Sequence, residues 1–145
     1  MKKRRGRRAD RDLGAPPGLV LDAGALQALE DHPIRLLADL QRAHDFGLPI
    51  RVPAGSLAQS WRGGPRSASL ARLLKQPCTV VQVDERSARE IGEFIASLRL
   101  PEHHKPDIAD AHVALTTRTT RSLVWTSDPE DMARYAVSAQ FIRRV

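Results

Sequence analysis

Short apolar runs alternate with helix-prone segments from residue 19 to the end of the chain, and this alternation limits the folds that the chain can adopt. Five runs are rich in aliphatic and β-branched residues but too short for helices, so we predict strands at residues 19–21, 48–52, 79–83, 123–125 and 141–142. Between them lie helix-prone segments, several with apolar residues recurring every three or four positions, which predict helices at residues 23–31, 34–46, 54–61, 67–75, 85–98, from 107 onward and at 129–136. Strands that alternate with helices form parallel sheets. The sequence therefore predicts a three-layer α/β/α fold with a mostly parallel central sheet of four to five strands.

The basic residues are concentrated at the N-terminus. Residues 1–12 contain seven Lys or Arg and two Asp, a net charge of +5, whereas the rest of the chain has 16 basic and 15 acidic residues. We therefore expect a disordered basic tail at residues 1–17 and a single domain at residues 18–145. Such a tail favours polyanions, although a merely solvated extension explains it equally well.

The sequence also indicates the cellular compartment of the protein. Asp10 and Asp12 stand where a secretion signal needs an apolar stretch, and no apolar run approaches the length of a membrane span. The single cysteine, Cys78, cannot form an internal disulfide and is expected to be a small buried hydrophobe. These features favour a cytoplasmic protein.

Aspartates follow two of the predicted strands. Asp22 comes directly after residues 19–21, and Asp128 follows residues 123–125 closely. Parallel strands end at one edge of a sheet, where such folds bind ligands, and Asp110 in the first turn of the helix from residue 107 is expected at the same edge. Carboxylates in one cleft repel each other, and Mg²⁺ or Mn²⁺ would relieve the repulsion. However, Asp is also a favoured helix N-cap, so the spacing alone leaves a metal site and two caps equally open.

The segments around these aspartates resemble the motifs of the PIN domain family. Residues 19–26 (LVLDAGAL) resemble its opening motif, residues 107–114 (DIADAHVA) its third and residues 126–132 (TSDPEDM) its fourth, while residues 52–64 resemble the second-motif helix of an actinobacterial-type branch. The resemblance runs from residue 19 to residue 145 in the order of the family. It implies a PIN-like fold and a Mg²⁺- or Mn²⁺-dependent endoribonuclease that hydrolyses RNA phosphodiester bonds, with Asp22, Asp110 and Asp128 as metal-binding catalytic acids. Because many members are VapC-type toxins, it also implies the toxin of a toxin–antitoxin system, an antitoxin partner and a homodimer.

One position departs from the family pattern. The second motif usually supplies a glutamate in the helix after the second strand, and Gln59 occupies that place. An amide brings no charge, so metal binding is weakened unless Asp107, which shares a helical face with Asp110, also serves as a ligand. The alternative is a non-catalytic PIN-like module that binds RNA or protein and carries a degraded metal site.

Other polar residues near the motifs are assigned supporting roles. Gln59, Thr126 and Asp131 are expected to surround the metal ligands, although Asp107 and Asp131 are also explained as acids that the helix dipole favours at a helix start. Arg62 and Arg66 are expected to hold phosphates of single-stranded or looped RNA, with solvated surface arginines as the alternative.

Several other chemistries find little support in the sequence. Ser56 and Ser60 lack the His–Asp partners of acyl transfer, and no glycine-rich phosphate loop is present. The adjacent His103 and His104 are expected in a solvated loop, because neighbouring residues seldom bind one ion well. His112, two residues after Asp110, should point away from that carboxylate and be packed or at the surface.

Overall fold

The computed structural model describes residues 17–145, so the predicted basic tail, apart from Pro17, lies outside the described residues. The strands are β1 (Leu19–Leu21), β2 (Ile50–Pro53), β3 (Thr79–Val81), β4 (Leu123–Thr126) and β5 (Ile142–Arg144). They form one sheet in the order β3-β2-β1-β4-β5, and every pairing is parallel. The predicted α/β fold with a parallel sheet is confirmed, at the upper limit of the expected strand number.

In the described part of the chain, seven α-helices connect the strands. They are α2 (Ala23–Asp31), α3 (Pro33–Asp45), α4 (Ala54–Ser60), α5 (Ala68–Lys75), α6 (Glu85–Ser97), α7 (Ile108–Thr120) and α8 (Pro129–Arg134), with 3-10 turns η1 (Gly64–Ser67) and η2 (Ala139–Phe141). None of these helices in residues 17–145 has both the length and the apolar character that a membrane span requires.

Some predicted boundaries of helices and strands are wrong, because residues at these boundaries take part in helix caps and turns. The backbone N–H of Leu48 still bonds the end of α3, after Gly47 adopts a positive φ of 77°, so β2 begins only at Ile50. Phe141 closes the η2 turn through its N–H and does not belong to β5. Ser67 belongs to η1, so α5 begins one residue later than expected. β3 ends at Val81, shortly before the Asp84–Ser87 capping box that starts α6.

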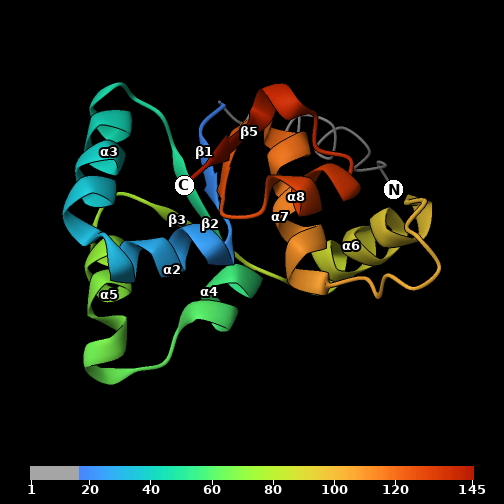
Figure 1. Cartoon of the computed structure of the whole chain (residues 1–145), viewed down its shortest axis with the longest axis horizontal. Coiled ribbons are helices and arrows are strands. Elements are labelled where there is room, and N and C mark those ends of the chain that lie inside the picture. Colours follow the sequence, from blue (N-terminus) through green and yellow to red (C-terminus); the bar gives the residue numbers. More distant parts are fainter. Residues whose placement is uncertain (1–16) are drawn as a thin grey trace, which may run out of the picture.

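Helices cover both faces of the sheet (Figure 1), and a hydrophobic core lies between the sheet and the helices on each face. Leu19 and Leu21 of β1 face the helices α2, α3 and α5, whereas Val20 between them faces α6, α7 and α8, as the alternation of a strand requires. Cys78 packs against the first core, as expected for a small hydrophobe. It is only partly buried, however, so the expectation of a fully buried thiol is wrong. Residue 78 lies just before β3 at the edge of the sheet, where neighbours cover less of it.

Close backbone approaches hold the helices together at the carboxyl edge of the sheet. A Cβ on Gly55 of α4 would lie 3.0 Å from the Cβ of Ala109 on α7, and one on Gly24 of α2 would lie 2.0 Å from the Ser127 Oγ after β4. The absence of side chains at these two glycines lets α4 lie against the start of α7 and α2 lie against the β4–α8 loop. The segments that carry the predicted acids therefore meet at one edge.

Candidate metal and nucleic-acid site

Asp22 is the most buried acid at the carboxyl edge, with a relative exposure of 6%. It is the N-cap of α2, and its Oδ1 accepts a hydrogen bond of 2.8 Å from the Ala25 N–H. Burial raises the pKa of Asp22, while hydrogen bonds from the Thr126 hydroxyl and from the Ala25 and Gly24 amides lower it and the negative charge of Asp128 raises it further. The capping role is thus confirmed, and the same carboxylate lies within electrostatic reach of a second acid.

Asp107 and Asp110 stand at the start of α7. Asp107 is the N-cap, with its Oδ1 accepting the Asp110 N–H at 3.0 Å, while its own N–H donates to the Tyr135 hydroxyl at 2.8 Å. Asp107 therefore caps α7, as expected for an acid at a helix start. Tyr135 is fully buried at the end of α8 and fixes the position of this cap, a contact that the sequence analysis did not identify.

The carboxyl group of Asp110 has a strongly raised pKa. Burial is the largest cause, and a hydrogen bond to Asp131 together with the charges of Asp107, Asp131 and Asp22 adds to it, raising the pKa of Asp110 to about 7. Two carboxyl groups can share a hydrogen bond only when one of them holds a proton. We define the acid cluster as Asp22, Asp107, Asp110, Asp128 and Asp131. Without a bound cation, Asp110 in this cluster keeps its proton up to about neutral pH.

Asp128 and Asp131 open α8. Asp128 is exposed and is the N-cap, its Oδ1 accepting the Asp131 N–H at 3.1 Å, and its own N–H donates to the Thr126 hydroxyl at 2.9 Å. Asp131 also contacts Arg134 at 3.5 Å. Thr126 thus links Asp22 to Asp128, which places it in contact with two of the three predicted ligands.

Gln59, which the motif resemblance matches to a glutamate, lies beside the acid cluster. Its Nε2 donates to the two carboxylate oxygens of Asp107 at 3.4 and 3.5 Å, across the contact between α4 and α7. Residue 59 therefore lies where a further carboxylate could join the acid cluster. Its side chain is an amide, however, which hydrogen-bonds Asp107 and adds no charge.

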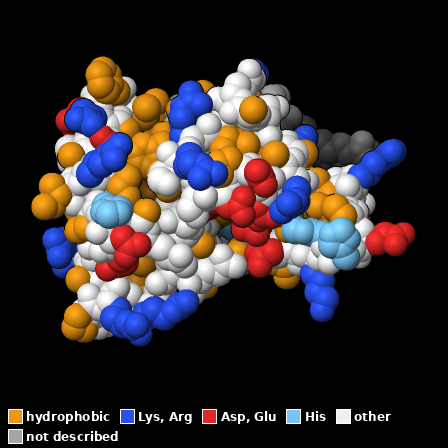
Figure 2. Space-filling model, viewed as in Figure 1, with side chains coloured by type: hydrophobic (Ala, Val, Ile, Leu, Met, Phe, Trp, Pro, Cys, Tyr) orange, Lys and Arg blue, Asp and Glu red, His pale blue; other side chains and the backbone are white. Residues whose placement is uncertain are grey.

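The acids lie close together but are not arranged as a complete set of metal ligands. Figure 2 shows acidic side chains grouped in the middle of the view, near the starts of α2 and α7 in Figure 1. Within residues 17–145, however, no three His, Cys, Asp or Glu side chains are arranged so that they could hold a metal ion as they stand. The fold brings Asp22, Asp110 and Asp128 to one edge, and their carboxylates are turned toward caps and toward one another.

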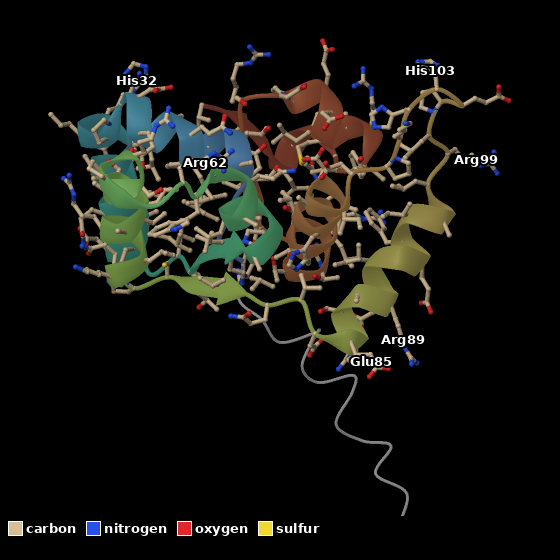
Figure 3. All side chains as sticks on the ribbon, turned by 90° about the horizontal axis from the view of Figure 1, so that it is seen from below. His32, Arg62, Glu85, Arg89, Arg99 and His103 are labelled. Carbon is tan, nitrogen blue, oxygen red and sulfur yellow. The ribbon has the colours of Figure 1, made fainter. Side chains whose placement is uncertain are left out.

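Arg62 and Arg66 lie beyond the end of α4, and both are exposed. They line a hollow of about 330 Å³ together with Glu30, Asp31 and Ser60. Figure 3 places Arg62 on the side of the α2, α4 and α5 helices, away from α6. The two acids in the hollow offset part of the positive charge that phosphates would meet.

The remaining polar candidates do not join the acid cluster. His103 is exposed, while His104 is partly buried, its ring making an edge contact with Tyr135 at a centroid distance of 6.1 Å. His112 is 3% exposed, as expected for a packed residue, and burial lowers its pKa. The Nδ1 of His112 and the Oγ of Ser56 are buried without a hydrogen-bond partner in the described structure.

Comparison with known proteins identifies no relative of this chain. Neither the family models, nor the curated proteins, nor the solved structures gave a significant match. The resemblance to the PIN domain family therefore stays a prediction from the motifs.

Proposed function

We propose that the protein is a divalent-metal-dependent endoribonuclease that hydrolyses RNA phosphodiester bonds at the carboxyl edge of its sheet. The observation that carries the proposal is the meeting of acids from three separate segments, the starts of α2, α7 and α8, with Asp110 at their centre. Structural caps alone do not require three helix starts to share one electrostatic environment. Mutual repulsion of this kind is what a bound cation relieves.

The donor set suits a hard cation. All five side chains of the acid cluster offer carboxylate oxygens, which Mg²⁺ and Mn²⁺ prefer, and His112 and Cys78 are not part of it. Asp22 is held in place by the Ala25 N–H, whereas Asp110 and Asp131 would have to give up their shared proton to bind an ion. Metal binding should therefore release a proton near neutral pH.

The proposed reaction gives each group of residues a separate role. A bound Mg²⁺ or Mn²⁺ would lower the pKa of a water molecule and offset charge on the phosphodiester. Asp22, Asp110 and Asp128 would hold the ion, and Asp107 would add charge next to Asp110. Thr126 orients Asp22 and the Asp128 backbone, and Arg62 and Arg66 would contact phosphates of single-stranded RNA.

Asparagine substitutions separate the metal-binding role from the capping role. Asn caps a helix as well as Asp does but lacks the charge, so Asp22→Asn and Asp128→Asn should keep the fold. Asp110 is not a cap, but the amide of Asp110→Asn has the same shape and can still donate to Asp131, so this variant should keep the fold as well. Each should reduce Mn²⁺-dependent cleavage of a labelled single-stranded RNA by about 100-fold. Asp45→Asn is the matched control, because Asp45 is an exposed carboxylate on α3 that accepts from Gln41 and should leave cleavage unchanged. Cleavage at the parent rate by all three variants would refute the proposal.

A second candidate function is a binding module without catalysis. Two observations favour it: Gln59 stands in place of a glutamate, and no three ligands converge in residues 17–145. The two functions differ in their response to metal. Titration with Mn²⁺ should raise the melting temperature of a nuclease through linkage, whereas a module with a degraded site should not respond.

A further inference from the structure

Among the elements of residues 17–145, no helix covers one stretch of the sheet on the face that carries the first core. On that face α2 packs on β1 and β4 and α3 packs on β2, whereas the helix that packs on β5, α8, belongs to the opposite face. A hollow of about 510 Å³ remains in front of β4 and β5. We call it the β4–β5 groove.

The β4–β5 groove is apolar at its base. Leu123 and Trp125 of β4 and Leu19 of β1 form its floor, and Leu36 and Ala43 of α3 stand on one wall. Leu36, Leu123 and Trp125 are only partly buried, although each packs against the first core. The groove therefore leaves hydrophobic surface uncovered at a position where α/β folds usually place a helix.

The rim of the groove is basic. Arg35 lies on the α3 side, and Arg143 and Arg144 lie on β5. Arg143 is in register with Trp125, so both side chains project from the same face of the sheet. Within residues 17–145 none of these three arginines is ion-paired, whereas the rim acid Asp39 is paired with Arg42. Figure 2 shows hydrophobic side chains in a hollow with basic side chains on both sides of it.

We propose that the β4–β5 groove is the docking site for an acidic amphipathic helix of a partner protein. The apolar face of such a helix would cover Leu123 and Trp125, and acidic residues along its borders would meet Arg35 on one side and Arg143 on the other. The proposal does not depend on the nuclease function, because the groove shares no residue with the acid cluster.

Charge disfavours two other occupants of the groove. The N-terminal residues 1–12 carry a net charge of +5, so they would be repelled by the basic rim. In a two-fold symmetric dimer formed over the groove, the rim arginines of the two copies would face each other. An acidic segment from a different protein fits the floor and the rim together.

Trp125 supplies a reporter on the groove floor. The chain has two tryptophans, and the other, Trp61, is 41% exposed at the end of α4, so Trp61→Phe leaves Trp125 as the single tryptophan. The probe is a display library of helical peptides with fixed apolar positions and with flanking positions that vary among Asp, Glu, Lys, Arg and Ser. Peptides are selected on the full-length protein, and their binding is then followed by Trp125 fluorescence.

The expected result is enrichment of Asp and Glu at the flanking positions and a saturable change in Trp125 emission. The charge-reversed variant Arg35→Glu/Arg143→Glu should bind the selected peptides weaker by about tenfold or more and should itself select Lys and Arg. The control Arg89→Glu/Arg99→Glu changes the net charge equally, at the opposite end of the molecule from the groove residue His32 (Figure 3), and should bind like the parent.

Three outcomes would overturn the proposal. The first is no enrichment on the parent protein, with all variants folded by circular dichroism. The second is enrichment that Arg35→Glu/Arg143→Glu does not alter. The third is a change in Trp125 emission with protein concentration alone, matched by dimerisation in sedimentation velocity, which would assign the groove to a second copy of the chain.

Discussion

The amide of Gln59 donates to the carboxylate of Asp107, with Nε2 3.4 Å from one oxygen and 3.5 Å from the other. This contact joins α4 to the start of α7 and neutralises no charge. It places an uncharged residue at the point where a further carboxylate would complete the acid cluster. The first prediction concerns this position.

Gln59→Glu should make the protein less stable without metal and more responsive to metal. A glutamate beside Asp107 adds like-charge repulsion, worth a few tenths of a kcal/mol at an exposed site. With Mn²⁺ the added ligand should increase the rise in melting temperature above that of the parent. Gln41→Glu is a matched control, because Gln41 also donates to an aspartate, Asp45, but on α3. An equal response to Mn²⁺ in both variants would show that residue 59 takes no part in metal binding.

The stability of the metal-free protein should fall as the pH rises toward 7. The pKa of Asp110 is about 7 in the folded state against an ordinary value of 3.8, so the folded state holds the extra proton between these values. This contribution is complete below pH 3.8 and is lost as the pH rises through 7. After allowance for solvent screening of a half-buried group, it amounts to about 1–2 kcal/mol.

Urea unfolding at a series of pH values measures this effect. The lowered pKa of His112 acts in the opposite direction, because stability due to a neutral buried histidine increases as the pH rises toward 6.5. The fall assigned to Asp110 should therefore be clearest just above that pH. The raised pKa of Asp22 contributes a fall of the same sign, so Asp110→Asn should reduce the fall and Asp45→Asn should retain all of it. An unchanged pH profile in Asp110→Asn would contradict the assignment.

Gly24→Ala should destabilise the junction between α2 and the β4–α8 loop. The added Cβ would lie 2.0 Å from the Ser127 Oγ, 2.9 Å from its Cβ and 3.1 Å from its backbone nitrogen. Rotation of the hydroxyl relieves only the first of these contacts, so we expect a cost of about 1–3 kcal/mol in urea unfolding. Ser127→Gly in the same chain removes two of the contacts and should recover part of the loss. Equal stability of Gly24→Ala and the parent would mean that the loop moves freely.

Two serines on α4 should respond differently to loss of their hydroxyl groups. The Ser56 Oγ is buried without a partner, whereas the Ser60 Oγ donates to the Ala23 carbonyl at 3.2 Å. Ser56→Ala removes an unpaired polar atom and should be neutral or stabilising, while Ser60→Ala should cost about 1 kcal/mol. Thermal unfolding of the two variants side by side tests this. A loss from Ser56→Ala as large as that from Ser60→Ala would show that the Ser56 hydroxyl has a partner after all.

Interactions between near neighbours in the chain could be predicted from the sequence. The helix faces follow from the spacing of apolar residues, and the caps at Asp22, Asp84, Asp107 and Asp128 each bond an amide three residues ahead. The gathering of acids at one edge follows from the geometry of parallel strands, once the alternation of strands and helices is recognised. These features depend on local backbone periodicity or on one general rule of sheet topology.

Only the tertiary structure decided which side chains touch. The contacts of Gln59 with Asp107 and of Asp110 with Asp131, the support of Asp107 by Tyr135 and the open groove in front of β4 and β5 all join segments far apart in the chain. Local periodicity fixes the face on which a residue lies but not the neighbour that it meets, which depends on strand order and on how closely helices approach. The sequence thus determined the layers and the edge where the acids lie, and packing determined that they meet one another without an arranged set of three ligands.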